Sequence, residues 1–281
     1  MSFLLSSEQS TLLYRRSGVD LFSPSANACI IGRSKGSTES AAEEIANVRP
    51  GAKILGIGGT DVRKAEDLQR AAEKCVEVLG SIDFVIAGAA GNFLAPIDQL
   101  SSNAFKSVID IDVLGSYNTL KATIPYLVQS AAKSKAQPSK FGTGGRIIFA
   151  HVSAAKSGVD SLSNVVALEY GPRGVTSNVI SPGPIGGTEG VARLLRDDPT
   201  SRESHTKQIP LGHYGSVKNI ADATVYLFAD SGSFVSGTNV IVDGAAWRVG
   251  AANPGFDFTY PDFLLSGETI SGVQGTKKSK L

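Results

Sequence analysis

The sequence predicts an α/β protein in which helices cover both faces of a doubly wound parallel sheet. Short apolar runs that could form buried strands alternate with longer helical stretches along most of the chain. The run over residues 82–87 is apolar apart from Asp83 and lacks the alternation of a half-exposed strand, as in central strands of parallel sheets. Repeated strand and helix units of this kind place a ligand crevice at the carboxyl ends of the strands.

Each element is justified by its own pattern, in chain order. Short apolar runs that stop at a glycine, a proline or a polar turn predict strands over residues 28–31, 53–57, 82–87, 146–149, 177–180 and 238–242. Apolar residues at helical spacing predict helices over residues 38–48, 65–79, 103–130, 153–169 and 220–228, with a further helical stretch near Arg193. Gly80 closes the second helix, and Ser181-Pro182-Gly183-Pro184 predicts a rigid turn.

One domain accounts for most of the chain. With 281 residues, of which 42% are apolar, the protein can bury one sizeable core without a second domain. Residues 1–25 show no clean period and predict an irregular N-terminal lead-in, residues 26–249 form the α/β domain, and residues 250–281 predict a flexible C-terminal tail rich in Gly, Ser and Pro.

Composition argues against several classes of function. A formal charge of +1 without a long basic stripe gives little support for nucleic-acid binding. Cys29 and Cys75 are unclustered, and His151, His205 and His213 include no pair at metal-ligand spacing, so we expect reduced core cysteines and no metal. No apolar run reaches the roughly 20 residues of a membrane-spanning helix.

Both ends of the chain bear on where the protein is targeted. The apolar stretch Phe3-Leu4-Leu5 is followed at once by serines and Glu8, so it is too short for a signal-peptide core. The sequence ends in Ser279-Lys280-Leu281, a tripeptide that an import receptor reads as a peroxisomal address. The alternative is an ordinary basic tail, and we expect a peroxisomal location.

Five short motifs stand in a fixed order along the chain. They are Asp61-Val62, Ala87-Gly88-Ala89-Ala90-Gly91-Asn92, Asp110-Ile111-Asp112, Ser153-Ala154-Ala155-Lys156 and Pro182-Gly183-Pro184-Ile185. Each alone is weak, but their order over about residues 26–247 resembles the short-chain dehydrogenase/reductase family. Residues 83–93, 151–160 and 182–190 further resemble the fungal-type peroxisomal 2,4-dienoyl-CoA reductases within that family.

This resemblance implies a fold, an activity and partners. The fold is a Rossmann-like sheet, and the activity is the NADPH-dependent reduction of a 2,4-dienoyl-CoA to a 3-enoyl-CoA. This oxidoreductase step belongs to the peroxisomal β-oxidation of unsaturated fatty acids. The partners are a fatty acyl-CoA substrate, the peroxisomal import receptor and further copies of the chain in a homo-oligomer.

Several residues are candidates for holding NADPH. Arg33 and Ser34 directly follow a strand, where a cation and a hydroxyl suit a ribose 2′-phosphate and an NAD enzyme usually has an acid; the alternative is a surface arginine in a turn. Asp61 would accept from the adenine amino group, or is a plain turn residue. Gly88 lets the backbone approach the cofactor because it has no Cβ. The resemblance adds the following positions: Val62, Ala87, Ala89, Lys156, Pro182, Gly183, Ile185 and Thr188.

The resemblance also implies three catalytic residues. Lys156 would hold the ribose hydroxyls, Asp112 would order the water that supplies a proton, and Ser153 would add a hydrogen bond in the same site. The structural alternatives are a solvent-facing helix lysine for Lys156, a helix-interior hydrogen-bonding residue for Asp112 and a buried helix serine for Ser153.

Two segments depart from the family pattern. The family begins with a strand, a glycine-rich loop and a helix, whereas Gly18 is the only glycine in residues 1–25 of this chain. We therefore expect the first strand and helix to be missing. A second gap follows residue 150, and Val152 stands where the family usually has the tyrosine of Tyr-x-x-x-Lys. Three hypotheses follow: an active reductase, an inactive truncated variant that retains only assembly surfaces, or a short-chain reductase on another acyl or keto substrate. Asp112 argues against the last.

Overall fold

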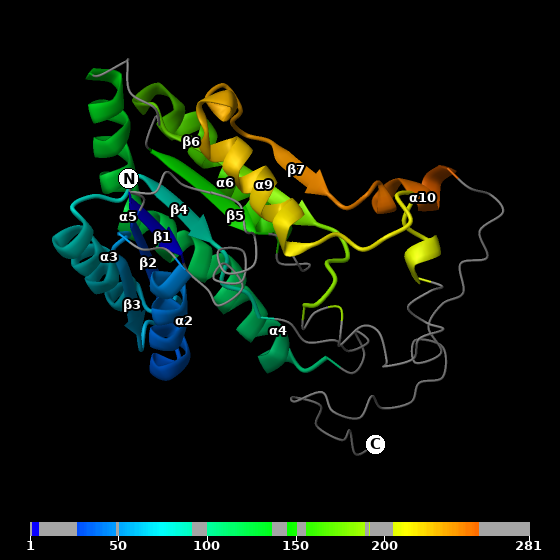
Figure 1. Cartoon of the computed structure of the whole chain (residues 1–281), viewed down its shortest axis with the longest axis horizontal. Helices are drawn as coiled ribbons and strands as arrows, with labels where there is room; N and C mark the ends of the chain where they lie inside the picture. The colour runs from blue at the N-terminus through cyan, green and yellow to red at the C-terminus, as the bar shows by residue number, and fades with distance from the viewer. Residues whose placement is uncertain are drawn as a thin grey trace.

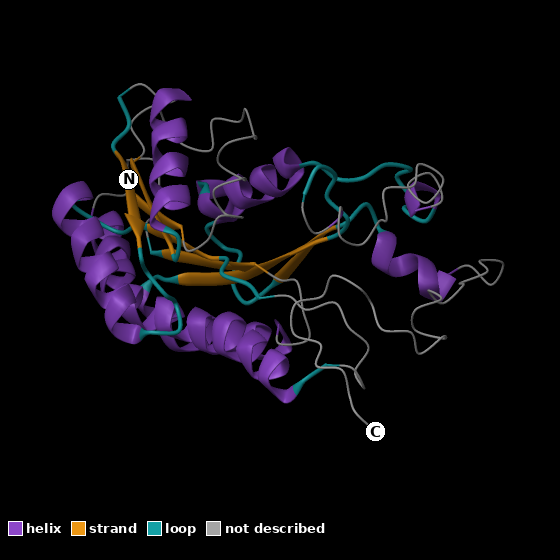
Figure 2. Cartoon of the chain, turned by 90° about the horizontal axis from the view of Figure 1, so that it is seen from below, coloured by secondary structure: helices purple, strands orange, loops and turns teal. Residues whose placement is uncertain are grey.

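The protein is built on one parallel sheet covered by helices on both faces (Figures 1 and 2). The computed structural model describes residues 2–5, 27–48, 51–91, 100–136, 145–150, 156–188, 191 and 205–252. Within these residues seven strands pair in the order β3-β2-β1-β4-β5-β6-β7. The order reverses direction between β1 and β4, which is the topological switch point of a doubly wound sheet. The predicted fold class is confirmed.

The elements lie close to their predicted positions. The strands are β1 Ser2–Leu5, β2 Asn27–Gly32, β3 Ile54–Gly58, β4 Phe84–Ala87, β5 Arg146–Ala150, β6 Thr176–Pro182 and β7 Asn239–Val242. The helices are α2 Lys35–Val48, α3 Ala65–Leu79, α4 Ser102–Val108, α5 Gly115–Ala136, α6 Lys156–Tyr170, α9 Val217–Phe228 and α10 Ala246–Ala252. Three short turns complete the set: a π-helical turn over Ile109–Leu114 and 3-10 turns over Gly171–Arg173 and Asp230–Gly232.

Two predicted elements have other bounds in the structure, and a third lies outside the described residues. The single helix expected over residues 103–130 consists of α4, the π-helical turn and α5. The rigid turn expected at residues 181–184 begins later, because Ser181 and Pro182 still belong to β6. The helical stretch expected near Arg193 lies outside the described residues.

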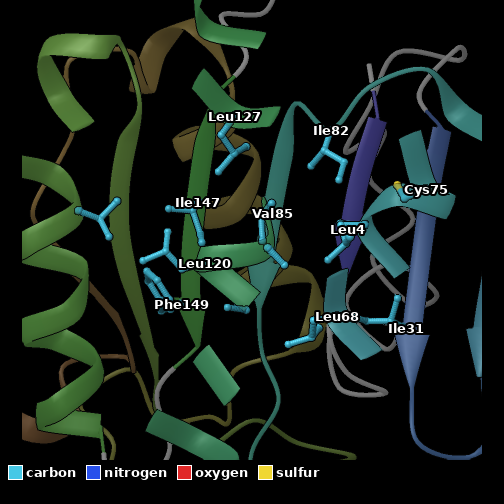
Figure 3. Close-up of a cluster of buried hydrophobic side chains, with 14 of the residues drawn as sticks. Leu4, Ile31, Leu68, Cys75, Ile82, Val85, Leu120, Leu127, Ile147 and Phe149 are labelled. Carbon is cyan, nitrogen blue, oxygen red and sulfur yellow. The ribbon is translucent and has the colours of Figure 1, made fainter. Parts of the chain in front are cut away.

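The centre of the sheet is filled by β1, so the expectation of a missing first strand is wrong. β1 runs parallel to β2, with Leu4 opposite Cys29, and parallel to β4, with Leu4 opposite Val85. The side chain of Leu4 is 1% exposed and packs in the core (Figure 3). Four residues are too few to show a period, and β1 is a strand because the edges of β2 and β4 satisfy its backbone groups. The glycine-rich loop and first helix would fall in residues 6–26, outside the described part.

The core consists of two apolar layers, one on each face of the sheet. In β2, Cys29 and Ile31 pack with α3, α5 and α6, whereas Ala28 and Ile30 pack with α2 and α9. This follows from the pleat, because successive side chains of a strand point to opposite faces. Figure 3 shows part of the first layer. Burial on both faces is what an apolar run without alternation predicts for a parallel strand.

A buried arginine joins the sheet to the end of α9. Arg146 opens β5, is 2% exposed, and donates from Nη1 to the carbonyl oxygens of Leu227 at 2.8 Å and Ala229 at 2.5 Å. Burial lowers the pKa of Arg146, while the charge of Asp230 raises it. The guanidinium therefore satisfies carbonyls that the end of a helix leaves without intrahelical donors.

Three further observations concern composition. Cys29 and Cys75 are both buried and form no disulfide. The pKa of Cys29 is raised, mainly by a hydrogen bond with Cys75 and also by burial. The described residues contain no group of three or more His, Cys, Asp or Glu side chains that could hold a metal ion. Within the same residues, no helix combines the length and the apolar character needed to cross a bilayer.

Candidate active site

Most of the candidate residues lie at the carboxyl ends of four strands. Arg33 follows β2, Asp61 comes shortly after β3, Gly88 follows β4 and Gly183 follows β6. Because these four strands run parallel in one sheet, their carboxyl ends lie along the same edge. The sheet thus brings together segments that are far apart in the sequence, at the place where doubly wound proteins bind ligands.

A buried ion pair lies beside the loop that follows β4. Lys156, the first residue of α6, and Asp112, in the π-helical turn, are both 0% exposed, and Nζ lies 3.1 Å from Oδ1. The solvent-facing alternative for Lys156 is therefore excluded. The second carboxylate oxygen, Oδ2, accepts a hydrogen bond of 2.7 Å from the amide of Gly91. One carboxylate thus joins the loop after β4, the π-helical turn and α6.

Among the described residues, none accepts a hydrogen bond from the ammonium of Lys156. Its contact with Asp112 is at ion-pair distance but outside hydrogen-bond geometry, and Nζ has no hydrogen-bond partner among the described residues. An ammonium carries three N–H donors, and buried polar groups in native proteins are nearly always satisfied. This unsatisfied buried cation fits a ligand that brings hydroxyl groups to the site.

The π-helical turn explains how a helix presents a carboxylate to its neighbours. A π turn accommodates an extra residue, which changes the direction of the side chains that follow, and such turns are frequent at functional sites. A Cβ on Gly91 would lie 3.0 Å from Cδ1 of Ile111 in this turn, so the loop passes close to it. On the other side, a Cβ on Gly115 would lie 2.6 Å from Cγ2 of Val62. Small residues allow both approaches.

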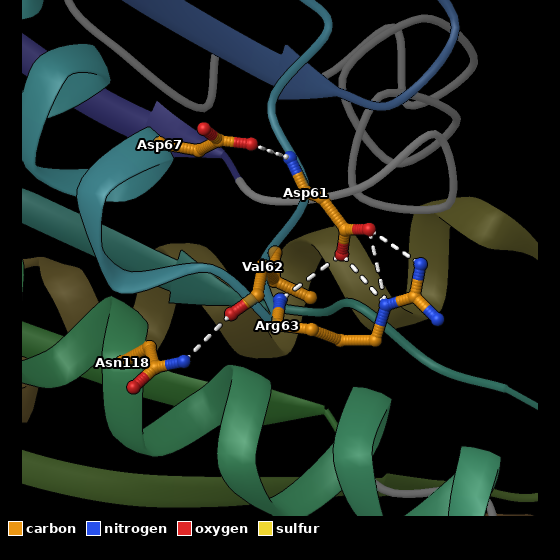
Figure 4. A network of polar contacts seen from close by, with 5 residues as sticks. All are labelled: Asp61, Val62, Arg63, Asp67 and Asn118. Carbon is orange, nitrogen blue, oxygen red and sulfur yellow. Dashed lines mark hydrogen bonds and ion pairs between the residues drawn. The ribbon is translucent and has the colours of Figure 1, made fainter.

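The end of β3 carries a second polar cluster, around Asp61 (Figure 4). Nε of Arg63 donates to both carboxylate oxygens of Asp61, at 2.9 and 3.0 Å, and Nη2 donates at 2.5 Å. The amide of Asp61 donates to Asp67 at 3.1 Å. The Arg63 side chain lowers the pKa of Asp61 to about 2; burial opposes this and the charge of Arg33 adds to it. Asp61 is therefore a fixed, ionised acceptor.

Two residues of this region were not identified from the sequence. Arg63 stands two positions after Asp61, and that spacing could have suggested the ion pair. Asn118, in α5, donates from Nδ2 to the carbonyl of Val62 at 3.0 Å and thereby fixes the turn after β3 (Figure 4). No local pattern indicates this contact, because the acceptor is a backbone atom far away in the chain.

The residues after β2 are accessible to solvent. Arg33 and Ser34 are exposed, and the carbonyl of Ser34 accepts from the amide and the hydroxyl of Thr38 at 3.1 and 2.7 Å as α2 begins. A Cβ on Gly32 would lie 2.5 Å from Oγ1 of Thr38, so a larger residue where the strand meets the helix would force the Thr38 hydroxyl to move. The side chains of Arg33 and Ser34 remain accessible to an anionic ligand.

The segment after β6 lies close to the end of β7. Pro182 is the last residue of β6, and a Cβ on Gly183 would lie 2.4 Å from Cβ of Asp243, so only glycine fits there. Ile185 is buried, and its carbonyl accepts a hydrogen bond of 2.7 Å from the hydroxyl of Thr188. Thr188 is thus held against its own turn.

The remaining candidates divide into two groups. Ala87 and Gly88 are buried, and Ala89 is partly buried, at the start of the loop that reaches Gly91. Ser153 lies outside the described residues.

This fold and this edge of polar residues define an α/β protein of the dinucleotide-binding type. The family model described as enoyl-(acyl carrier protein) reductase matches residues 25–245. The chain belongs to the short-chain dehydrogenase/reductase family, as its motifs indicated. Members of this family are oxidoreductases that use a nicotinamide dinucleotide.

Individual proteins support the same assignment. The chain is 43% identical over 243 residues to the peroxisomal 2,4-dienoyl-CoA reductase of Saccharomyces cerevisiae, covering 86% of this chain and 82% of that protein. The Arabidopsis thaliana peroxisomal 2,4-dienoyl-CoA reductase is 37% identical over 236 residues, covering 79% and 76%. A short chain dehydrogenase structure from Bacillus anthracis has a TM-score of 0.69 at 27% identity, covering 88% of this chain and 96% of that one.

Proposed function

We propose that the protein reduces 2,4-dienoyl-CoA to (3E)-enoyl-CoA with NADPH. The observation that carries this proposal is the buried pair of Asp112 and Lys156 beside the loop after β4. It occurs in a chain whose relatives are named as peroxisomal 2,4-dienoyl-CoA reductases producing that product. The ammonium of Lys156 can donate to a ligand, and the carboxylate of Asp112 is shielded from bulk water. Both properties suit a reaction in which a hydride and a proton are transferred inside a closed site.

The residues of the chain divide the work as follows. NADPH, when bound, supplies a hydride to the far end of the diene. Lys156 holds the ribose hydroxyls with the donors that its surroundings leave unused. Asp112 orients the water that delivers a proton to the carbon beside the thioester, and the amide of Gly91 keeps that carboxylate in place. Hydride and proton at the two ends leave one double bond between them, which is the 3-enoyl product.

NADPH rather than NADH is supported by the end of β2. Arg33 and Ser34 are exposed directly after the strand, where the ribose of a dinucleotide lies in doubly wound folds. A guanidinium matches the geometry of a phosphate, and an adjacent hydroxyl can donate to it. Asp61 and Val62 at the end of β3 would contact the adenine.

A peroxisomal location and a homo-oligomer complete the proposal. The names of the relatives and the terminal Ser279-Lys280-Leu281 both favour import into peroxisomes, although the tripeptide lies outside the described residues. Removing Leu281 from a chain with an N-terminal fluorescent tag should abolish peroxisomal targeting. Exposed apolar side chains on α5 and α6, among them Tyr117, Val165 and Leu168, support pairing of copies through these helices.

The activity is tested by titrating the purified protein with NADPH by fluorescence and following the dienoyl-CoA absorbance. We expect saturable binding and loss of the dienoyl signal, and a fall of at least about a hundredfold in kcat/KM for Lys156→Met. Lys106→Met is the matched control, because Lys106 lies on α4 and pairs with Asp110 at the surface. A folded chain that binds no NADPH would support the inactive variant. Reduction of a ketoacyl-CoA but not of the dienoyl-CoA would support the other substrate class.

A further inference from the structure

Two arginines and one carboxylate meet where β2 and β3 end. β2 and β3 pair as far as Gly32 and Gly58, and the carbonyl of Gly32 then accepts a hydrogen bond of 3.0 Å from the amide of Thr60. Arg33 and Asp61 are the next residues on either side of this bond. The backbone therefore holds them as neighbours, and the charge of Arg33 lowers the pKa of Asp61, as expected for two nearby opposite charges.

The carboxylate is nevertheless bound to a different arginine. Arg63 donates three side-chain hydrogen bonds to Asp61, and its own amide donates a fourth, to Oδ1 at 3.0 Å. Both carboxylate oxygens are therefore occupied by Arg63 (Figure 4). Arg33 forms no ion pair within the part of the chain that the structure describes. Among the described residues, the guanidinium of Arg33 therefore has no carboxylate bound to it at the end of β2.

This arrangement has a consequence for any phosphate that approaches Arg33. A carboxylate without Arg63 would attract the guanidinium of Arg33 to itself and would repel a phosphate dianion. Paired with Arg63, the same carboxylate belongs to a group with no net charge. A dinucleotide without a 2′-phosphate would not experience this difference.

We propose that Arg63 determines cofactor preference: by holding Asp61 in an ion pair, it keeps Arg33 available for the ribose 2′-phosphate of NADPH. The inference rests on the proposed use of NADPH. Arg63 acts through Asp61 and does not touch the phosphate, so it is a positioning residue.

The test is the ratio of the dissociation constants for NADPH and NADH, measured by calorimetry on the full chain. Arg63→Ala should weaken NADPH binding roughly tenfold more than NADH binding, the size expected of one partly screened charge near a protein surface. Adding Asp61→Asn to Arg63→Ala should restore the wild-type ratio, because the competing charge is gone. Arg63→Lys should keep most of the preference because it keeps the cation.

The control is Lys218→Ala, which removes a cation that forms an exposed ion pair with Asp222 on α9 and should leave the ratio unchanged. Thermal unfolding of each variant shows that it is folded. Equal weakening of both cofactors by Arg63→Ala, or a double variant that fails to recover the ratio, would overturn the inference while the proposed function stands. A wild-type chain without preference for NADPH would overturn the proposed cofactor and this inference together.

Discussion

Replacing Asp112 by Asn tests whether the buried ion pair governs the stability of the site. The substitution removes the negative charge and keeps the shape, and the amide oxygen of Asn can still accept from Gly91. What is lost is the partner of a fully buried ammonium, since both Asp112 and Lys156 are 0% exposed. Removing one partner of a buried pair typically costs about 3–5 kcal/mol, because an uncompensated charge stays in the interior.

Urea unfolding of the wild type and four variants, Lys156→Met alone among them, separates this effect from a general disturbance of the helix. Asp112→Asn should lower the free energy of unfolding by about 3–5 kcal/mol, whereas adding Lys156→Met should recover much of the loss because no charge is then buried. Asp110→Asn is the control, since Asp110 lies in the same turn as Asp112 but pairs with Lys106 of α4 in contact with solvent, and this pair should contribute at most about 1 kcal/mol. If the double variant is as unstable as the sum of its single changes, the buried charge is not the cause.

Three further outcomes follow from the fold. Leu4→Ala should cost about 2–5 kcal/mol in the same urea assay, because Leu4 is a fully packed core residue of β1; a loss near zero would mean that β1 is not part of the sheet. Arg146→Met should cost about 2–4 kcal/mol, since two carbonyls at the end of α9 lose a charged donor while one buried charge is removed; a more stable variant would show that desolvation of the guanidinium dominates. The folded-state pKa of Asp61 is depressed from 3.8 to about 2, so its stabilising contribution is present above the higher value and is lost as pH falls toward the lower one. Melting temperatures in this acid range should therefore fall less steeply for Arg63→Ala than for the wild type, and identical slopes would contradict the assignment.

The length of an element decided how well the sequence predicted it. The helix over residues 65–79 was predicted at the bounds that α3 has, because fifteen residues show the helical period and Gly80 ends it with φ of 88°. β1 was missed because four residues show no period and its pairing partners lie far along the chain. The π-helical turn was missed because inserting one residue into a long helix does not change the residue types or the apolar spacing enough to be recognised in the sequence.

The candidate site was predicted in its parts but not in its contacts. The order of motifs indicated Asp112 and Lys156, and the structure shows that they form one buried pair. The motifs did not indicate Arg63, because its role depends on the contact of its side chain with Asp61. They also did not indicate Asn118, because its acceptor is the backbone carbonyl of Val62. Residue types can be matched to a pattern, whereas hydrogen bonds to main-chain atoms depend on the path of the backbone.

The presence of β1 bears directly on the hypothesis of an inactive chain. β1 separates β2 from β4 in the sheet, so the cluster around Arg33 and Asp61 and the pair around Asp112 and Lys156 flank it at the spacing of a doubly wound fold. A chain without this strand would bring β2 and β4 together and displace one cluster relative to the other.

The sequence departs from the family pattern in the segment between β1 and β2, and not in the strand itself. Gly18 is the only glycine of that segment, where the family has a glycine-rich loop that binds the pyrophosphate. A defect confined to that segment should weaken cofactor affinity and leave the geometry of proton transfer unchanged. It should therefore appear as a raised Kd for NADPH, with reduction recovered at a sufficiently high cofactor concentration.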